Sequence, residues 1–498
     1  MDFAGLPEHA PHAAQTVPSV RLRELNQAPP RPGGKWVLYW MQGQRRARYN
    51  FALQHARDLA RVYQKPLLVL ETLRQDEPWA SGRFHRFVLE GMADNAAAFA
   101  RGPACYAARL APTAEDERQL VEALGARACA VVADGLPASP AQRIAHALAP
   151  RLEVAMVEVD GHGLLPLRRT SKPHATARGF RRVLHELAPE SFAAWPRAAP
   201  LRCAALPPLT TPVELRERWP ALCPAQLQDL EAVTSELPFS GSPGPCGTRG
   251  GSRGARARLA EFVATGVGTY GAERNHPDDE GGSGLSPYLH FGHIATHEVL
   301  RALELHPHRF EPARAGKREG FWGAPEDTEA FLDELLTWRE LALNAAAHLP
   351  YYAQYRSLPG WARATLEAHA SDPRPALHGV AQLAAGETGD PVWNAAQRQL
   401  RTEGTMHGYL RMLWGKRILE WTACPQEAFE VMVELNNRYA LDGRDPSSYA
   451  GIAWVLGRYD RAWGPERPIF GTVRYMSSRN TRRKLRLDAY LQRYGAAD

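Results

Sequence analysis

Residues 35–73, "KWVLYWMQGQRRARYNFALQHARDLARVYQKPLLVLETL", decide the fold of the N-terminal part of the chain. The first eight residues are a short apolar and aromatic run of the kind found in buried strands. Residues 50–64 then repeat apolar side chains at helical spacing, and residues 65–73 form a second apolar run rich in leucine. A strand, a helix and another strand in this order predict a parallel sheet, because two parallel strands need a crossover between them.

The same alternation continues along the chain to about residue 165. The segments "ACAVVADGL" (128–136) and "EVAMVEVDG" (153–161) are further strand candidates, each preceded by helix-like sequence. We therefore predict an α/β N-terminal domain with a Rossmann-like parallel sheet over residues 34–165. Residues 1–33 are expected to be a disordered tail, and residues 166–255, which become rich in proline and glycine, a linker and loop region.

Beyond residue 255 nearly every periodic segment is helical, which predicts an all-helical domain over residues 256–498. The segments with this spacing are "ARLAEFVATG" (257–266), "HIATHEVLRALEL" (293–305), "AFLDELLTWRELALNAAAH" (330–348), "PVWNAAQRQLRTEG" (391–404), "YLRMLWGKRILEW" (409–421) and "PQEAFEVMVELNNRYA" (425–440).

Composition and short motifs exclude several classes of protein. Hydrophobic residues make up 44% of the 498 and charged ones 23%, as in ordinary globular proteins, and no run of 18 apolar residues is present. The N-terminus has no secretory or transit pattern, so a cytoplasmic location is expected. The six cysteines form no C-x-x-C pair, and we expect no metal site. "GVGTYG" (266–271) and "GGSRG" (250–254) lack the strand that a dinucleotide turn or a nucleophile elbow requires.

Three other patterns each have a functional and a structural interpretation. Trp414 and Trp421 are seven residues apart and share a helix face, where packing is the simpler explanation. In "GGSGLSPYLHFG" (281–292), Ser283 and Ser286 precede a helix, which suits either a phosphate or an ordinary helix cap. The basic stretch "RYMSSRNTRRKLRLDAYLQR" (474–493), whose basic residues are densest from Arg474 to Arg486, is a phosphate track or a solvated face, and the net charge of +6 permits nucleic acid.

Read together, several ordered blocks resemble one family, the class II cyclobutane pyrimidine dimer photolyases of the cryptochrome/photolyase family. The N-terminal "WVLYWMQGQRRARYNFAL" (36–53) is also similar to the opening of that family. The main blocks are "YGAERNHPDDEGGSGLSPYLHFG" (270–292), "FLDELLTWRELALN" (331–344), "DPVWNAAQRQL" (390–400), "GTMHGYLRMLWGKRILEW" (404–421), "LNNRYALDGRDPSSYAGIAW" (435–454) and "ERPIFGTVRYM" (466–476).

This resemblance implies an enzyme, a deoxyribodipyrimidine photo-lyase, in which the helical domain binds FAD and DNA. In this family light drives an electron from fully reduced FAD to a pyrimidine dimer flipped out of the DNA. The implied partner is UV-damaged DNA, double- or single-stranded, with no membrane, and a monomer is expected. An antenna chromophore of the deazaflavin or folate type is left open, because the match is thin after residue 70.

The resemblance also assigns roles around the flavin. Trp393, Trp414 and Trp421 match the tryptophans through which this family reduces its flavin, Asn436 matches the side chain facing flavin N5, and Arg411 and Asp442 match the ion pair beside the flavin ring. The alternative for that pair is a structural salt bridge. The remaining residues implied to bind the cofactor are Tyr270, Ser283, Leu285, Ser286, Arg339, Asn344 and Arg444.

For the lesion, Glu334 resembles the acid that hydrogen-bonds the pyrimidine carbonyl, and burial against aromatic rings should raise its pKa. Its alternative is a solvated helix glutamate. Trp338, on the same helix face, would join Trp454 as an apolar clamp on the flipped bases, and Met412 would line the pocket. Arg474 matches the position that fills the hole left in the duplex.

Two other functions remain open at this point. A cryptochrome-like photoreceptor would keep the flavin and tryptophans but needs no lesion pocket, so Glu334 and its neighbours argue against it. Repair of (6-4) photoproducts would require a histidine acid, for which His290 and His407 are candidates by residue type only. Thr405, Leu413 and Gly389 depart from the family pattern without removing a named catalytic group.

Overall fold

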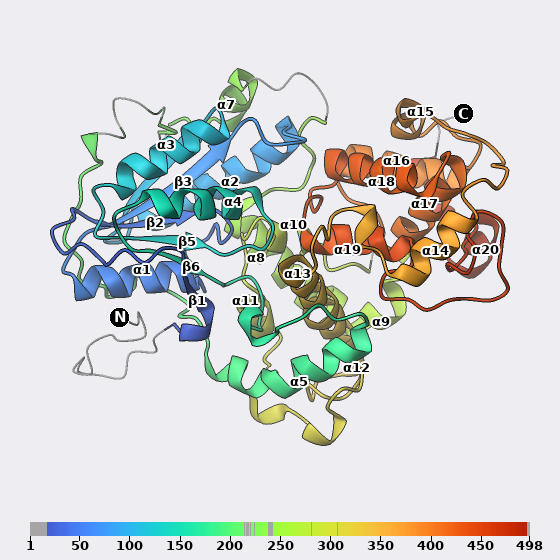
Figure 1. The fold of residues 1–498 in the computed structure, drawn as a ribbon, viewed down its shortest axis with the longest axis horizontal. Coiled ribbons are helices and arrows are strands. Elements are labelled where there is room, and N and C mark those ends of the chain that lie inside the picture. Colours follow the sequence, from blue (N-terminus) through green and yellow to red (C-terminus); the bar gives the residue numbers. More distant parts are fainter. Residues whose placement is uncertain are drawn as a thin grey trace. The chain divides into compact units, whose positions relative to one another are not determined.

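The computed structural model describes residues 17–495 except 214, 216–218, 220, 224, 238–242, 280 and 306. The chain forms two compact units, and Figure 1 shows strands in the first and mostly helices in the second. The first unit comprises Met1–Thr170, Leu187–Leu259 and Pro287–Pro307, and the second Ser171–Glu186, Ala260–Ser286 and His308–Asp498. Both fold classes expected from the sequence are therefore present.

A six-stranded sheet forms the centre of the first unit. The order is β1-β6-β5-β2-β3-β4, with all neighbours parallel except β1 and β6, which are antiparallel. The strand order reverses between β2 and β5, which makes that point the topological switch of the sheet. The strands are β1 (Leu22–Glu24), β2 (Val37–Met41), β3 (Leu67–Arg74), β4 (Cys105–Ala111), β5 (Ala130–Asp134) and β6 (Met156–Val159).

The four strands expected from apolar runs are confirmed, and two others were missed. β2, β5 and β6 are buried at every position, as strands covered by helices on both faces must be. β4, "CYAARLA", has few β-branched residues and carries Arg109, so its sequence does not stand out. β1 lies within the expected tail. Its pairing with β6 corrects that expectation for residues 22–24, while residues 1–16 lie outside the described residues.

Helices surround this sheet, and several begin at a capping side chain. Asn50 accepts a hydrogen bond from Leu53 N at the start of α1, and Thr113 and Asp116 form a capping box at α3. The helices of this unit, some of which run into the second, are α1 (Phe51–Val62), α2 (Gly82–Phe99), α3 (Ala114–Gly125), α4 (Pro140–Leu148), α5 (Ala177–Ala193), α7 (Leu230–Glu236), α8 (Gly251–Glu261), α10 (Ser286–His290) and α11 (Thr296–Ala302).

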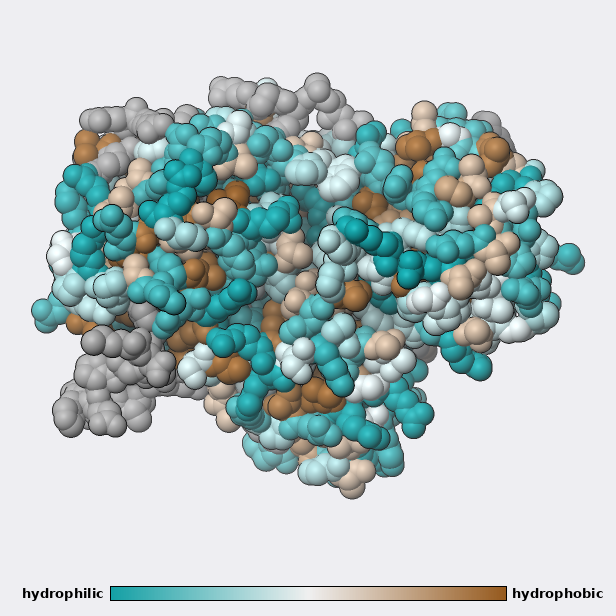
Figure 2. Space-filling view, viewed as in Figure 1, coloured by the Kyte–Doolittle hydropathy of each residue, from teal (hydrophilic) through white to brown (hydrophobic). Residues whose placement is uncertain are grey.

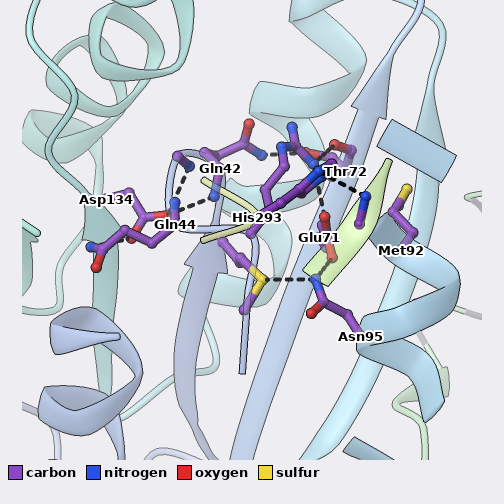
Figure 3. Close-up of polar contacts among 12 residues, drawn as sticks. Gln42, Gln44, Glu71, Thr72, Met92, Asn95, Asp134 and His293 are labelled. Atoms are coloured by element: carbon purple, nitrogen blue, oxygen red, sulfur yellow. Dashed lines mark hydrogen bonds and ion pairs between the residues drawn. The ribbon is translucent and has the colours of Figure 1, made fainter. Parts of the chain in front are cut away.

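Carboxylates at the C-terminal ends of the strands hold the loops at that edge (Figure 3). Asp134, at the end of β5, accepts hydrogen bonds from the backbone N–H groups of Gln42, Gly43 and Gln44, all at 2.8 Å. Glu71, on β3, accepts from Asn95 at 2.9 Å and also from Arg45 and Tyr106. These carboxylates therefore bind groups of the chain itself at this edge of the sheet.

The second unit is almost entirely helical. Wide π-helical turns, η4 (Phe262–Gly266) and η9 (Asp333–Trp338), interrupt it at two places. Its remaining helices are α9 (Tyr270–Glu273), α12 (Glu326–Leu332), α13 (Arg339–His348), α14 (Gly360–Ala368), α15 (Val380–Ala385), α16 (Pro391–Glu403), α17 (Gly408–Trp421), α18 (Pro425–Tyr439), α19 (Pro446–Val455), α20 (Ser478–Lys484) and α21 (Asp488–Tyr494).

The expected domain boundaries differ from the two units in a definite way. The stretch 166–255 is not only linker, because it contains α5, α7 and the start of α8. Residues 171–186 pack in the second unit, and residues 287–307 in the first. The proline- and glycine-rich composition therefore coincides with a region where the chain passes between the two units. It does not identify a linker without secondary structure.

On the face in Figure 2, hydrophobic residues are scattered among hydrophilic ones. Within the part of the chain that the structure describes, no helix combines the length and apolarity needed to cross a bilayer.

Candidate active site

A cavity of about 1080 Å³ opens within the second unit. Side chains from α9, η9, α16, α17, α19, α20 and α21 line it, together with the glycine-rich turn before α10 and the loop around residue 465. Its size is at the upper end for ligand pockets, which suits a large ligand. Among the described residues, no group of three or more His, Cys, Asp or Glu side chains could hold a metal ion.

Three residues that the sequence singled out meet on one wall of this cavity. Arg411 Nη2, on α17, lies 3.2 Å from Asp442 Oδ1, which belongs to the loop after α18. Ser286 Oγ donates to Asp442 Oδ2 at 3.0 Å. Because the arginine and the aspartate are only partly exposed, the pair presents a fixed cation and a fixed carboxylate to whatever occupies the cavity.

The turn over residues 281–286, which we call the Gly-Ser turn, forms the adjoining part of the wall. Gly284 has φ +66°, a conformation that favours glycine, and a Cβ on Gly282 would meet open space. Ser283 and Ser286 line the cavity. Leu285 does not, since it is buried in the protein, so its expected contact is at most through the backbone.

Glu334 faces the same cavity from the π-helical turn η9. Its Oε1 lies 2.5 Å from Arg274 Nη1, and 39% of its side chain is exposed through the opening. Burial raises the pKa of Glu334 above its ordinary value, while Arg274 lowers it by less. The expected rise in pKa is confirmed in direction, although an arginine that the sequence did not single out partly opposes it.

The neighbouring Asp333 points to a different partner. Its carboxylate accepts hydrogen bonds from Arg181 at 2.9 and 3.1 Å and is nearly fully buried. Two adjacent acids in one π-helical turn thus serve different purposes, since Asp333 holds α5 and Glu334 lines the cavity. Such wide turns are often found at functional sites.

Trp338 and Trp454 form an aromatic pair whose arrangement corrects the expected clamp. Their ring centroids are 4.5 Å apart with an interplanar angle of 16°, so the two rings stack on each other. No base fits between rings in contact, and the pair offers one apolar platform instead of two jaws. Trp454 and Met412 line the cavity, whereas Trp338 does not.

Trp393, Trp414 and Trp421 are buried and in contact, with Trp393 in the middle of the series. Its ring is parallel to that of Trp414 at 6.4 Å and nearly perpendicular to that of Trp421 at 5.4 Å. The indole N–H of Trp393 donates to Trp414 O at 3.0 Å, and that of Trp414 to Gln397 at 2.9 Å. Arg417 lies over the Trp421 ring at 4.4 Å.

Besides Leu285, four residues expected to lie around the flavin do not line this cavity. Asn436 donates to Ser448 Oγ at 2.5 Å and is buried, and Asn344 holds the segment at Lys172 and His174 through its side-chain amide. Arg339 and Arg444 are also absent from the lining, although both interact elsewhere in the unit. Tyr270 does line the cavity, and burial raises its pKa to about 12.

Arg474 lies on the cavity lining beside a tryptophan that sequence reasoning missed. Its guanidinium lies 4.5 Å over the ring of Trp463 and 3.1 Å from Asp460 Oδ2. Asp460 also accepts from Trp463 Nε1 at 2.9 Å, so one carboxylate orients both residues. Lys484, from the basic stretch, is on the lining too.

Some lining residues carried a usable signal in the sequence, and others did not. Arg274 follows Tyr270 by four residues within a block already singled out, so helical spacing alone could have identified it. The lining residues of α21, including Tyr490 and Arg493, come from an ordinary polar segment. Nothing in that segment's composition distinguishes it from a surface helix.

Comparison with known proteins identifies the family of this chain. Residues 331–422 match the FAD binding domain of DNA photolyase. A deoxyribodipyrimidine photo-lyase of Methanothermobacter thermautotrophicus is 34% identical over 475 residues, covering 95% of this chain and 97% of that protein. One from Arabidopsis thaliana is 31% identical over 466 residues, covering 91% of this chain and 88% of that protein.

A solved structure is similar in fold across both units. The crystal structure of a bacterial class III photolyase from Agrobacterium tumefaciens matches with a TM-score of 0.67 at 19% identity, covering 93% of this chain and 86% of that chain. At this identity the likeness concerns the fold alone. The relatives that match over nearly their whole length carry the assignment, and this chain belongs to the DNA photolyase family.

Proposed function

We propose that this chain is a class II photolyase that uses light to split cyclobutane pyrimidine dimers in DNA. The proposal rests on one observation. The same cavity is lined by Glu334, Trp454, Met412 and the Arg411–Asp442 pair. Such a repair enzyme needs two parts in one place. One is a wall that binds the flavin, and the other is an acid beside an apolar aromatic platform. The proposed protein acts as a cytoplasmic monomer on dimers in double- or single-stranded DNA.

The donor set of the cavity fits FAD. Hydroxyls of Ser283, Ser286 and Tyr270, with the open space beside Gly282, suit phosphate and ribityl oxygens. The cation of Arg411 suits a flavin ring that carries negative charge when reduced. When bound and reduced, FAD supplies an electron on illumination and takes it back after the dimer has split.

Glu334 and the Trp338–Trp454 platform have different roles in binding the lesion. A flipped-out dimer loses its base stacking, and the exposed face of Trp454 replaces part of it. A protonated Glu334 donates a hydrogen bond to a pyrimidine carbonyl, and its raised pKa favours the protonated form. Arg274 keeps the carboxyl oriented at 2.5 Å before the dimer arrives.

Arg474 and the basic residues after it would hold the DNA around the cavity. Arg474 is fixed by Asp460 at 3.1 Å, and Arg482 and Arg483 on α20 are exposed. Contacts of this kind to phosphate position the duplex without reading its sequence. The three buried tryptophans would carry electrons toward the flavin from the protein surface, in addition to packing the core.

We do not extend the proposal to an antenna chromophore. Asp134, at the switch point of the sheet, and Glu71, on the neighbouring strand β3, accept hydrogen bonds from the chain's own side chains and backbone (Figure 3). A ligand at that edge would have to displace them. The absorbance spectrum of protein purified from its own source would test this, since a bound antenna adds a band that flavin lacks.

The test of the proposed function is a repair assay on defined oligonucleotides. Reduced, flavin-loaded protein is mixed with DNA holding one cyclobutane dimer or one (6-4) photoproduct, and each mixture is illuminated or kept dark. We expect repair of the cyclobutane dimer alone, only in the light, and reduced by Glu334→Ala. Flavin photoreduction without repair of either lesion would support a photoreceptor instead, and repair of the (6-4) product would overturn the proposed substrate.

A further inference from the structure

The C-terminal helix α21 forms one wall of the cavity. Tyr490, Arg493 and Tyr494 on this helix line it, next to Gln399 and Glu403 on α16. Tyr490 and Tyr494 are 4% and 8% exposed, so the helix is packed in place. None of these residues belongs to the motifs through which the sequence pointed to a flavin site.

Hydrogen bonds hold α21 against α16. Tyr490 OH donates to Gln399 Oε1 at 2.9 Å, and Tyr494 OH donates to Glu403 Oε1 at 2.6 Å. Arg398 Nη1 donates to Tyr494 O at 2.8 Å, which satisfies a carbonyl at the end of the helix. One side of α21 is thereby fixed to a long helix of the core.

The other side of α21 holds the chain just before the Gly-Ser turn. Tyr490 N donates to Asp278 Oδ1 at 2.8 Å, and Arg486 forms an ion pair with Asp279. Both aspartates belong to the short turn η6 (Pro277–Asp279). Ser283, which lines the cavity, follows Asp279 by only four residues, so the position of η6 limits how far the Gly-Ser turn can move.

We propose that residues 485–494 are a latch that holds the Gly-Ser turn closed and so slows the release of the bound flavin dinucleotide. The inference rests on the proposed function only in taking this turn as the flavin-phosphate wall. The latch residues act through η6 and are positioning residues. They bridge the core helix α16 and η6, so we expect the Gly-Ser turn to open more easily when either connection is broken.

The connections differ in expected strength. Arg486 is 61% exposed, so its ion pair with Asp279 contributes little on its own. The bond from Tyr490 N to the Asp278 carboxylate is partly buried and charge-assisted, which makes it the stronger one. Loss of it should speed flavin release by about tenfold or more, and loss of the ion pair by about two- to fivefold.

The experiment measures flavin release from the full-length, loaded protein. Each variant is diluted rapidly, and protein-bound flavin is followed over time by absorbance after gel filtration. Asp278→Ala tests the stronger bond, and Arg486→Gln, Asp279→Asn and their combination test the ion pair. Arg438→Gln is the matched control, because Arg438 pairs with Glu434 at 2.6 Å and neither residue lines the cavity.

We expect the increase in flavin release rate in the combined variant to be no larger than the increase in Arg486→Gln or Asp279→Asn alone. The swapped pair, Asp279→Arg with Arg486→Asp, should regain slow release. Release at the wild-type rate in Asp278→Ala and in the ion-pair variants would overturn the latch. If Asp278→Ala does not fold, Tyr490→Phe decides, because it keeps the ring and removes only the bond to Gln399.

Failure of the latch can be told apart from failure of the proposed site. Ser283→Ala together with Ser286→Ala should weaken flavin binding if the turn holds the phosphates. If these two changes leave flavin binding intact, the assignment of the Gly-Ser turn to the flavin phosphates is wrong. The latch, which depends on that assignment, is then wrong as well. If they weaken binding while the latch variants do not, only the latch is wrong.

Discussion

The second unit holds two groups of tryptophans that differ in burial and surroundings. The buried tryptophans, Trp393, Trp414 and Trp421, are at most 3% exposed and touch each other in series. The second group, which we call the cavity tryptophans, comprises Trp454 and Trp463, which line the cavity, and Trp338, which stacks on Trp454. Trp463 is 37% exposed, and the other two are partly exposed and stacked on each other.

The two groups therefore differ in function, although all of their members are tryptophans. A buried, ordered series of indoles can relay charge without contacting the ligand, and it also supports the core. A partly exposed ring at a cavity can contact a flipped base but contributes less to stability. We therefore expect substitutions in the two groups to affect different measurements.

The largest expected effect is on flavin photoreduction. Trp414→Phe keeps an aromatic ring in the core but removes an indole from the buried series, so photoreduction of oxidised flavin should be nearly lost. Absorbance under continuous blue light, with an external reductant present, measures it. The control Trp463→Phe should photoreduce as the wild type does. Normal photoreduction in Trp414→Phe would show that electrons reach the flavin by another path.

The next effect is on stability. Trp393→Ala removes a fully buried ring and should lower the free energy of unfolding by about 3–5 kcal/mol. Trp463→Ala, at a partly exposed position, should cost about 1 kcal/mol or less. Urea unfolding of the flavin-free proteins gives both values. Equal losses would mean that the two groups do not differ in their structural contribution.

Binding of damaged DNA should depend on the cavity tryptophans. Trp454→Ala removes the ring that lines the cavity and should weaken binding of dimer-containing DNA by about 1–3 kcal/mol, as loss of base stacking does. Fluorescence anisotropy at fixed salt measures it, with undamaged DNA as the reference. A similar loss for Trp414→Phe would contradict the separation of tasks.

The smallest effect concerns pH. The pKa of Glu334 is raised, so the carboxyl keeps its proton to a higher pH than an ordinary glutamate and loses it as the pH rises further. Repair should therefore fall on the alkaline side of that pKa, and Glu334→Gln should remove this limb. Arg274→Gln takes away a cation that lowers the pKa, so the limb should move to higher pH. A shift to lower pH would contradict the assigned interaction.

Most of the fold followed from the sequence, because the buried strands and the amphipathic helices have clear periods. β4 was not predicted because its sequence has few β-branched residues and includes Arg109, so it does not resemble a buried strand. β1 was not predicted because three residues are too few to show a periodic pattern. The composition of residues 166–255 predicts a linker, although helices form there, because α5 contains Pro189 and α8 begins in glycine-rich sequence. Helix formation there depends on packing that composition does not reveal.

The site was predictable where residues lie in distinctive motifs. Ser286, Arg411 and Asp442 were singled out from three separate blocks, and the structure brings them within hydrogen-bonding distance. The stacking of Trp338 on Trp454 was not predictable, because helical spacing within one segment says nothing about a ring from another helix. The wall formed by α21 was missed for the same reason.

The most direct test of the separation of tasks is repair by protein whose flavin has been reduced chemically beforehand. Under single-turnover conditions in the light, Trp414→Phe should repair a cyclobutane dimer at the wild-type rate, because the buried series is no longer needed. Trp454→Ala should repair far less at DNA concentrations near the wild-type Kd. If Trp414→Phe also loses repair, the buried tryptophans are part of the repair site and the account is wrong.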